Sequence, residues 1–180
     1  MITVFCSGKL EKFLGKVVVV SAATSEPLLG NWNGHSVHVG RKRCMIFLNS
    51  KTCYVVLITA VLKKDVGNFA DFFRERLVHQ LADDFNLTER MEVSLRRELS
   101  DINVAHSNNN KHVIGTMNQH VQVLPYYLTR YGPVENWDEL SMSYLLNEVP
   151  SGAEVWAKKK KSEYFNPRTA MGELLNQMTS

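Results

Sequence analysis

The sequence predicts an α+β fold, in which an N-terminal antiparallel sheet is covered on one face by C-terminal helices. Two patterns support this. The chain up to Ala60 is rich in short β-branched and aromatic runs, whereas the later residues place apolar side chains three and four apart. Strands that precede helices, rather than alternate with them, are typical of this class. No internal repeat or linker divides the 180 residues, so we expect a single domain over residues 1–180.

Short runs of β-branched and aromatic residues mark the first expected strands. Residues 1–6, MITVFC, are typical of a strand, and residues 16–22, KVVVVSA, fit a strand that is covered on both faces. Residues 7–15 are expected to form a short helix between them, because a capping serine begins the segment and a glycine ends it. Residues 24–36 contain Pro, Gly and Asn, and we expect a loop there.

The strongest local signal is a β-hairpin over Val37–Ala60. A two-residue turn at Ser50 and Lys51 would place Cys44 and Cys53 about four residue pairs apart along the ladder, which is too far for a disulfide. We therefore expect free thiols. The odd count of three cysteines fits a reducing compartment, and no secretory signal is recognised, so a cytoplasmic location is expected.

After the hairpin, the apolar spacing becomes typical of helices that pack on a core. Capping residues at their starts and Pro or Gly at their ends bound several of these segments. A short strand over residues 101–107 is expected among them. The expected helices cover residues 65–85, 86–99, 112–132 and 136–152, and a last one begins near Pro167. Pro125 would kink or end the segment 112–132, which is therefore expected as one helix or as two pieces.

Several stretches together resemble a known family. The pattern over residues 26–58 has a Leu-Gly-x-Trp element, basic residues and a hairpin of the LFxN type, and residues 108–124 are similar to an Asn-x-x-Val-x-Gly-x-Met-Asn signature. Residues 6–15, 146–152 and 164–175 resemble the opening and closing elements of the same family. It is an uncharacterised family of small bacterial proteins, a domain of unknown function. The resemblance implies no activity, but members occur on plasmids and other mobile elements, which suggests a mobile-element accessory factor.

The stretch Ser107–His120, SNNNKHVIGTMNQH, contains four asparagines and two histidines. In one interpretation His112 and His120 form the acid–base pair of a small metal-independent nuclease or toxin-like enzyme. Their Cα atoms would be roughly 12 Å apart on a straight helix, and imidazoles reach poorly over that distance. The interpretation we favour is architectural: Asn109 or Asn110 caps a helix, and Gly115 allows another backbone to approach closely.

The same stretch also offers groups for contact with a nucleic acid or a protein partner. The candidates there are Asn110, Lys111 and Asn118. The family resemblance implies Arg-Ser where this chain has Lys111 and His112, so a role that depends on that arginine does not transfer.

Basic residues gather at two further places beside aromatic ones. Arg41 and Arg43 stand at the entry to the hairpin, and strand alternation places them on one face. The second cluster lies close to three aromatic residues, Trp156, Tyr164 and Phe165, and consists of Lys158, Lys159, Lys160 and Lys161. Such clusters fit phosphate contact and base stacking. Trp32 is either a further stacking face or a buried anchor, and the sequence does not decide whether the two clusters meet.

Composition and missing motifs exclude several classes of function. The net charge of +3 is too mild to indicate a nucleic-acid partner by itself. The longest apolar run falls far short of the roughly 20 residues of a membrane-spanning helix, so no membrane partner is expected. Phosphate-loop, dinucleotide-binding, serine-hydrolase and zinc motifs are missing, and we therefore expect no cofactor and no metal.

These observations predict a non-enzymatic binding or regulatory protein that contacts a protein partner or a nucleic acid. The nuclease with His112 and His120 is the alternative. A third hypothesis is a subunit of a larger assembly, because the apolar and aromatic stretch Leu124–Gly132 would form a protein interface if it were exposed. The oligomeric state is not predicted.

Overall fold

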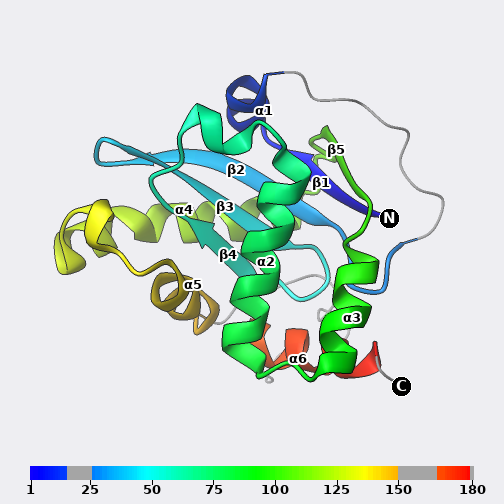
Figure 1. Ribbon diagram of the computed structural model, residues 1–180. Coiled ribbons are helices and arrows are strands. Elements are labelled where there is room, and N and C mark those ends of the chain that lie inside the picture. The colour runs from blue at the N-terminus through cyan, green and yellow to red at the C-terminus, as the bar shows by residue number, and fades with distance from the viewer. Residues whose placement is uncertain (16–25, 150–165, 179–180) are drawn as a thin grey trace.

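The computed structural model describes residues 1–15, 26–149 and 166–178. Its strands form a five-stranded sheet in the order β4-β3-β2-β1-β5 (Figure 1). The strands are β1 (Ile2–Cys6), β2 (Trp32–Val39), β3 (Lys42–Asn49), β4 (Val55–Ile58) and β5 (Ile102–His106). Strand β5 confirms the strand expected at 101–107, whereas the segment 16–22 lies outside the described residues.

The sheet is mixed, so the predicted purely antiparallel arrangement is wrong. Strands β2, β3 and β4 pair antiparallel, but β1 pairs parallel with both β2 and β5. Parallel neighbours need a connection that crosses back to the same end of the sheet. The connection between β1 and β5 ends in two helices, after which the chain enters β5 at the same end of the sheet as β1. Local sequence patterns predict where strands lie in the chain. They do not predict at which end of the sheet a long connection returns, and therefore not whether two strands pair parallel or antiparallel.

Helices cover both faces of the sheet, which corrects the expectation of a single covered face (Figure 1). The helices are α1 (Gly8–Leu14), α2 (Phe69–Phe85), α3 (Glu89–Glu98), α4 (Lys111–Tyr131), α5 (Glu139–Asn147) and α6 (Pro167–Gln177), with short 3-10 turns η1 (Lys63–Val66) and η2 (Val134–Asn136). The α+β class itself is confirmed, with most helices after the first four strands. Among the described residues, no helix is both long and apolar enough to cross a membrane.

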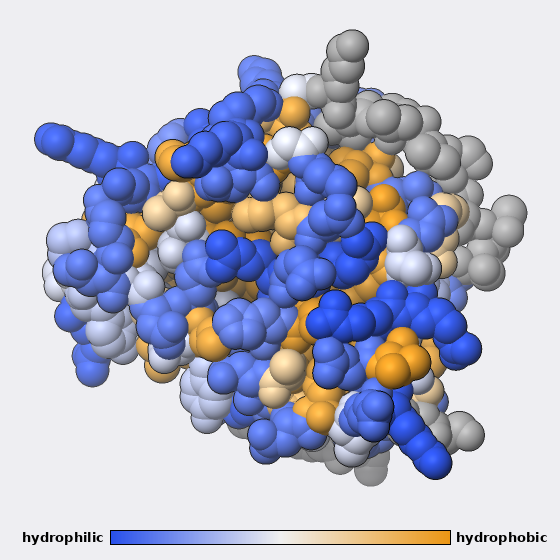
Figure 2. Space-filling model, viewed as in Figure 1, coloured by the Kyte–Doolittle hydropathy of each residue, from blue (hydrophilic) through white to orange (hydrophobic). Residues whose placement is uncertain are grey.

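Alternation along β3 explains why two layers of helices are needed. Met45 and Phe47 belong to the core shared with α1, α2, α3 and α6, whereas Ile46 and Leu48 belong to the core shared with α4 and α5. A strand that is apolar on both faces must be covered on both. On the outside of α2 and α3, hydrophilic side chains cover most of the surface and hydrophobic ones show between them (Figure 2).

The hairpin predicted over Val37–Ala60 is present, but two details differ. Strand β2 begins at Trp32, inside the segment predicted to be a loop. The turn between β3 and β4 is longer than two residues, because the backbone N–H of Asn49 donates to the carbonyl of Tyr54. The side chain of Asn49 accepts hydrogen bonds inside this turn and thereby stabilises the longer loop. The free cysteines are confirmed, and all three are buried.

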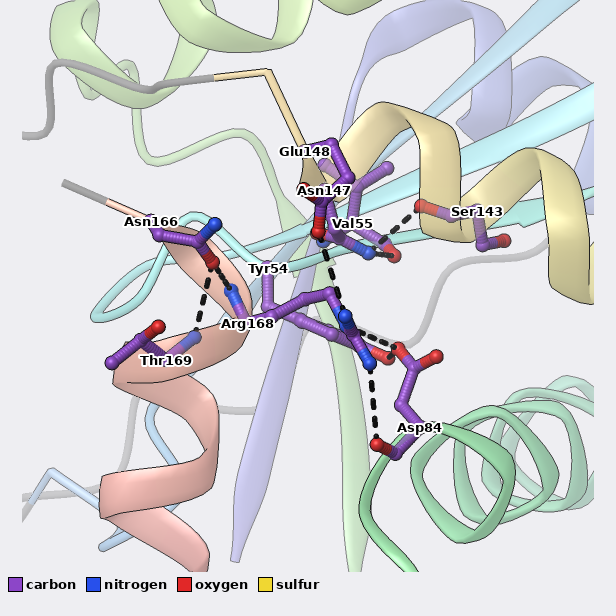
Figure 3. A network of polar contacts seen from close by, with 9 residues as sticks. All are labelled: Tyr54, Val55, Asp84, Ser143, Asn147, Glu148, Asn166, Arg168 and Thr169. Atoms are coloured by element: carbon purple, nitrogen blue, oxygen red, sulfur yellow. Dashed lines mark hydrogen bonds and ion pairs between the residues drawn. The ribbon is translucent and has the colours of Figure 1, made fainter. Parts of the chain in front are cut away.

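The edge strand β4 is sealed by polar side chains of α5 (Figures 1 and 3). Asn147 accepts a hydrogen bond from the Val55 N–H at 2.7 Å and donates to the Val55 carbonyl at 2.8 Å. One helical turn away, Ser143 accepts from Leu57, and a further turn away Glu139 accepts from the N–H of residue 59. Four residues of helix advance about 6 Å and two residues of strand about 6.6 Å, so the two ladders match. The edge is therefore closed to further strands.

Candidate functional site

A pocket of about 430 Å³ opens between α1, the β2–β3 hairpin and η1. In the upper part of Figure 1, α1 and η1 lie side by side above β2. The described residues that line it are Lys9, Lys12, Phe13, Ser36, Val37, His38, Arg43 and Lys63. Three separate segments therefore bring three lysines and one arginine to one concave surface.

Helix α1 presents Lys9, Lys12 and Phe13 on one face, because residues three and four apart are neighbours on a helix. Leu10, on the neighbouring side of the helix, is fully buried and packs against the sheet. That packing needs Gly34 of β2, since a Cβ there would lie only 2.6 Å from the Leu10 side chain. The close approach of helix and strand is what places the two lysines above the hairpin.

Arg43 is the best-fixed cation of the pocket. Its Nη1 donates to the Ser36 hydroxyl at 2.9 Å, and its guanidinium lies 4.3 Å from the centre of the Phe13 ring. The ammonium of Lys63 donates to the Phe13 carbonyl and lies 5.4 Å from the same ring. Stacking on the ring and the hydroxyl contact hold the planar arginine fork in place before any ligand arrives.

The electrostatics of this pocket are unbalanced. None of the described residues that line it carries a carboxylate. The charged groups of Arg43 and Lys63 lie near one ring, within about 10 Å of each other, so they repel by roughly 1–2 kcal/mol before salt screening. Glu11 of α1 faces away from the pocket, with its Oε1 2.9 Å from His106 Nδ1. An anionic ligand with several acceptor oxygens would complement these cations.

The described residues contain no group of three or more side chains that could hold a metal ion. Four clustered cations also disfavour a divalent cation at the pocket by simple repulsion. The groups that remain for ligand contact are the N–H donors of the lysines and the arginine, the Ser36 hydroxyl and the exposed His38 ring.

The structure separates the two arginines predicted to share a face. Arg43 enters the pocket from β3, whereas Arg41 lies in the turn between β2 and β3 and lines a different groove beside Leu128 and Gly132. The prediction that alternation places both on one face is therefore wrong, since Arg41 lies outside β3, where the chain turns. The lysines predicted to join them, Lys158, Lys159, Lys160 and Lys161, lie outside the described residues.

Trp32 is not available as a stacking face for a base. Its side chain is fully buried and packs edge-to-face on Phe73 of α2, with the ring centres 5.5 Å apart. The alternative, a buried anchor, is confirmed. Residues two apart on a strand point to the same face of the sheet, so Trp32 faces the core when the residue two positions later does.

The asparagine-rich stretch starts α4, as favoured. The side chain of Asn110 accepts hydrogen bonds from the backbone N–H groups of His112 and Val113, so Asn110 is the N-cap. Lys111 and Asn118 are exposed on the helix. The expected close packing at Gly115 is wrong, because no atom lies within 4 Å of the position that a Cβ would take.

The proposed histidine pair does not form an accessible acid–base site. His112 is exposed, whereas His120 is only 2% exposed and faces the sheet. Burial lowers the pKa of His120 to about 4, so it stays neutral near pH 7. The helix turns His120 toward the sheet and leaves the neighbouring Val121 partly exposed. The pair therefore gives the nuclease alternative no support.

The aromatic stretch Leu124–Gly132 is partly on the surface. Tyr126 is 58% exposed and Tyr131 is 42% exposed, while Tyr127 is buried between them and the core. Arg130 donates to the Tyr126 hydroxyl at 3.2 Å and lies over the Tyr131 ring. A protein interface at this patch remains a prediction.

Sequence reasoning missed most of the residues that line the pocket. Lys9, Lys12 and Phe13 had a usable signal, since their spacing of three and four residues places two cations and a ring on one helix face. Lys63 had none, because it follows β4 and meets α1 across 50 residues of sequence. Only Arg43 was identified in advance.

A second charged cluster joins α6 to the ends of α2 and α5 (Figure 3). The Tyr54 hydroxyl donates to Oδ2 of Asp84, and Arg168 Nη2 donates to the Asp84 carbonyl at 3.3 Å. The Nε of Arg168 lies 3.8 Å from Oδ2 of Asp84, and its Nη1 lies 3.5 Å from Glu148. The guanidinium also stacks 4.2 Å above Tyr144. Burial and the Asp84 carboxylate raise the pKa of Tyr54, so it remains a donor.

Comparison with known protein families identifies the family to which the chain belongs. The family model described as Domain of unknown function (DUF6933) matches residues 3–170. The chain belongs to this family. The DUF6933 match begins in β1 and ends within α6, so it spans both clusters and the whole of α4. Neither the curated proteins nor the solved structures contain a match to the chain.

Proposed function

We propose that the protein is a non-enzymatic nucleic-acid-binding protein that holds phosphate groups in the pocket between α1, the hairpin and η1. The observation that carries the proposal is the convergence of four cations from three chain segments on a concave surface whose described lining has no carboxylate. A cluster of this kind gains from an anion, because each phosphate contact relieves repulsion and releases counterions.

The arrangement of Arg43 supports phosphate over other anions. Its guanidinium is planar, held by Ser36 and Phe13, and can offer two parallel N–H donors to a pair of phosphate oxygens. The lysines act as point charges around it. Nothing in this arrangement reads a base edge, so we expect binding that depends weakly on sequence.

The test is fluorescence anisotropy with a labelled single-stranded oligonucleotide at two salt concentrations. If all four cations contact phosphate, affinity should fall roughly 50-fold when salt rises from about 50 to about 200 mM. The substitution Arg43→Gln should weaken binding about tenfold at low salt and make the salt dependence shallower.

The matched control is Arg97→Gln, which removes the same charge from an exposed position on α3. It should leave affinity nearly unchanged, since α3 contributes nothing to the pocket. The proposal fails if the wild-type protein does not bind at low salt, or if the two variants weaken binding equally.

A further inference from the structure

We infer that the pocket recognises a terminal phosphate group with several charges, such as a phosphomonoester or polyphosphate end, rather than a phosphodiester within a strand. This inference rests on the proposed function and names the part of the ligand that the site takes. The same chemistry occurs at the 5′ end of a nucleic acid and on a free nucleotide, and the experiment below separates these two sources.

The shape of the pocket is the first argument. It is bounded by α1, by the hairpin and by η1, and its volume of about 430 Å³ is in the range of sites that enclose one small ligand. Duplex DNA instead spreads its charges along a convex surface, with one charge per roughly 1.7 Å of axis. A concave site of this size fits one phosphorylated end better than a length of backbone.

Charge matching is the second argument. An internal phosphodiester brings one negative charge, whereas a phosphomonoester carries about −1.5 to −2 at pH 7, and a polyphosphate adds to that. The pocket is lined by Lys9, Lys12, Arg43 and Lys63, and the last two lie over the Phe13 ring. One phosphodiester would leave most of that charge without a partner, whereas a terminal polyphosphate can meet all four cations.

Donor placement is the third argument. The Arg43 fork is fixed on one side by Ser36 and on the other by Phe13, while the lysines approach from α1 and η1. A terminal phosphate has three oxygens free to accept, compared with two in a phosphodiester, so cations that surround it from several directions can all be satisfied.

The experiment compares one RNA sequence with three 5′ ends: hydroxyl, monophosphate and triphosphate. Anisotropy is measured at about 50 mM salt in the presence of a chelator, so that bound magnesium does not mask the phosphates. We expect affinity to rise in that order, by at least about tenfold from hydroxyl to triphosphate. Inorganic tripolyphosphate should displace the 5′-triphosphate RNA, since both present terminal phosphate oxygens.

Two variants link the effect to the pocket. Arg43→Gln and Lys12→Gln should each reduce the preference for triphosphate to below about threefold, whereas Arg97→Gln should retain it. Circular dichroism shows whether each variant is folded. Lys12 is exposed, so its substitution keeps the test informative if Arg43→Gln does not fold.

The outcomes separate the inference from the proposed function. Equal affinity for the three ends, with binding still dependent on Arg43, would overturn the inference and leave nucleic-acid binding in place. If tripolyphosphate and nucleoside triphosphate bind but none of the oligonucleotides does, the terminal-phosphate site is supported and the nucleic-acid partner is overturned. No binding of any probe would overturn both.

Discussion

The protein contains two clusters of charged side chains, and they differ in how their charge is balanced. Around Arg168, one guanidinium meets the carboxylates of Asp84 and Glu148 and stacks on Tyr144. Around Arg43, a guanidinium also stacks on an aromatic ring, but three lysines surround it and no described lining residue carries a carboxylate. The same residue type, in the same kind of stacked contact, therefore serves two purposes.

The difference shows which cluster supports the fold and which is available for a ligand. In the Arg168 cluster the cation is paired with carboxylates, and the cluster joins helices that are distant in sequence, so removing a member should lower the free energy of unfolding. In the Arg43 cluster, like charges repel one another on the surface. Removing a cation should therefore weaken ligand binding without lowering the free energy of unfolding.

The largest expected effect is at Asp84. The substitution Asp84→Ala leaves the buried Tyr54 hydroxyl without its acceptor and removes a carboxylate that is 1% exposed from beside Arg168. Breaking a buried ion pair from one side costs about 3 kcal/mol, so the free energy of unfolding in urea should fall by that amount.

The neighbouring residue provides the control for this prediction. Asp83→Ala removes the same charge from an exposed position on the same helix turn, and it should change stability by no more than about 0.5 kcal/mol. If both substitutions cost the same, the Arg168 cluster is not the structural joint that its geometry indicates.

The second prediction concerns His120, which is buried and has no charged partner among the described residues. Its pKa is about 4 in the folded protein, because burial disfavours the charged ring, and 6.5 is the ordinary value for an unfolded chain. Between these values the unfolded chain binds the proton and the folded one does not. Stability should therefore fall as pH drops from 6.5 to 4, by about 3 kcal/mol in total, and be flat in this respect above and below that window.

Urea unfolding of wild type and His120→Leu at pH 7.5, 6, 5 and 4.5 isolates this contribution from the titration of carboxylates. The variant should lose less stability over the range, and His112→Leu, an exposed site on the same helix, should behave as wild type does. Parallel pH profiles for all three proteins would show that His120 is not buried in solution.

The fold was predictable to the extent that its signals are local. Apolar spacing identified α2 and the start of α6 near Pro167, and β-branched runs identified β1 and β3, because these patterns reflect burial of one face within a few residues. The parallel pairing of β1 with β5 depends on where a connection of nearly a hundred residues returns. No pattern within either strand encodes that return.

The candidate site was less predictable for the same reason. Arg43 was identified because basic residues adjoin a strong hairpin signal, and Lys9 and Lys12 could have been, from helical spacing. Trp32 was ambiguous, since a stacking residue and a core anchor look alike in sequence, and burial decided it. Asp84 and Arg168 are 84 residues apart, and only the folded chain shows that they pair.

The smallest expected change in stability is at the pocket, and it gives the most direct test of the contrast. The double substitution Lys9→Gln and Lys12→Gln removes two exposed cations that face Arg43 and Lys63. Stability at low salt should stay the same or rise by up to about 0.5 kcal/mol, because repulsion in the folded state is relieved. Added salt screens repulsion, so raising it from about 20 to about 500 mM should stabilise wild type more than the variant. A loss above about 1 kcal/mol would instead mean that these lysines support the fold, and the distinction between the two clusters would no longer hold.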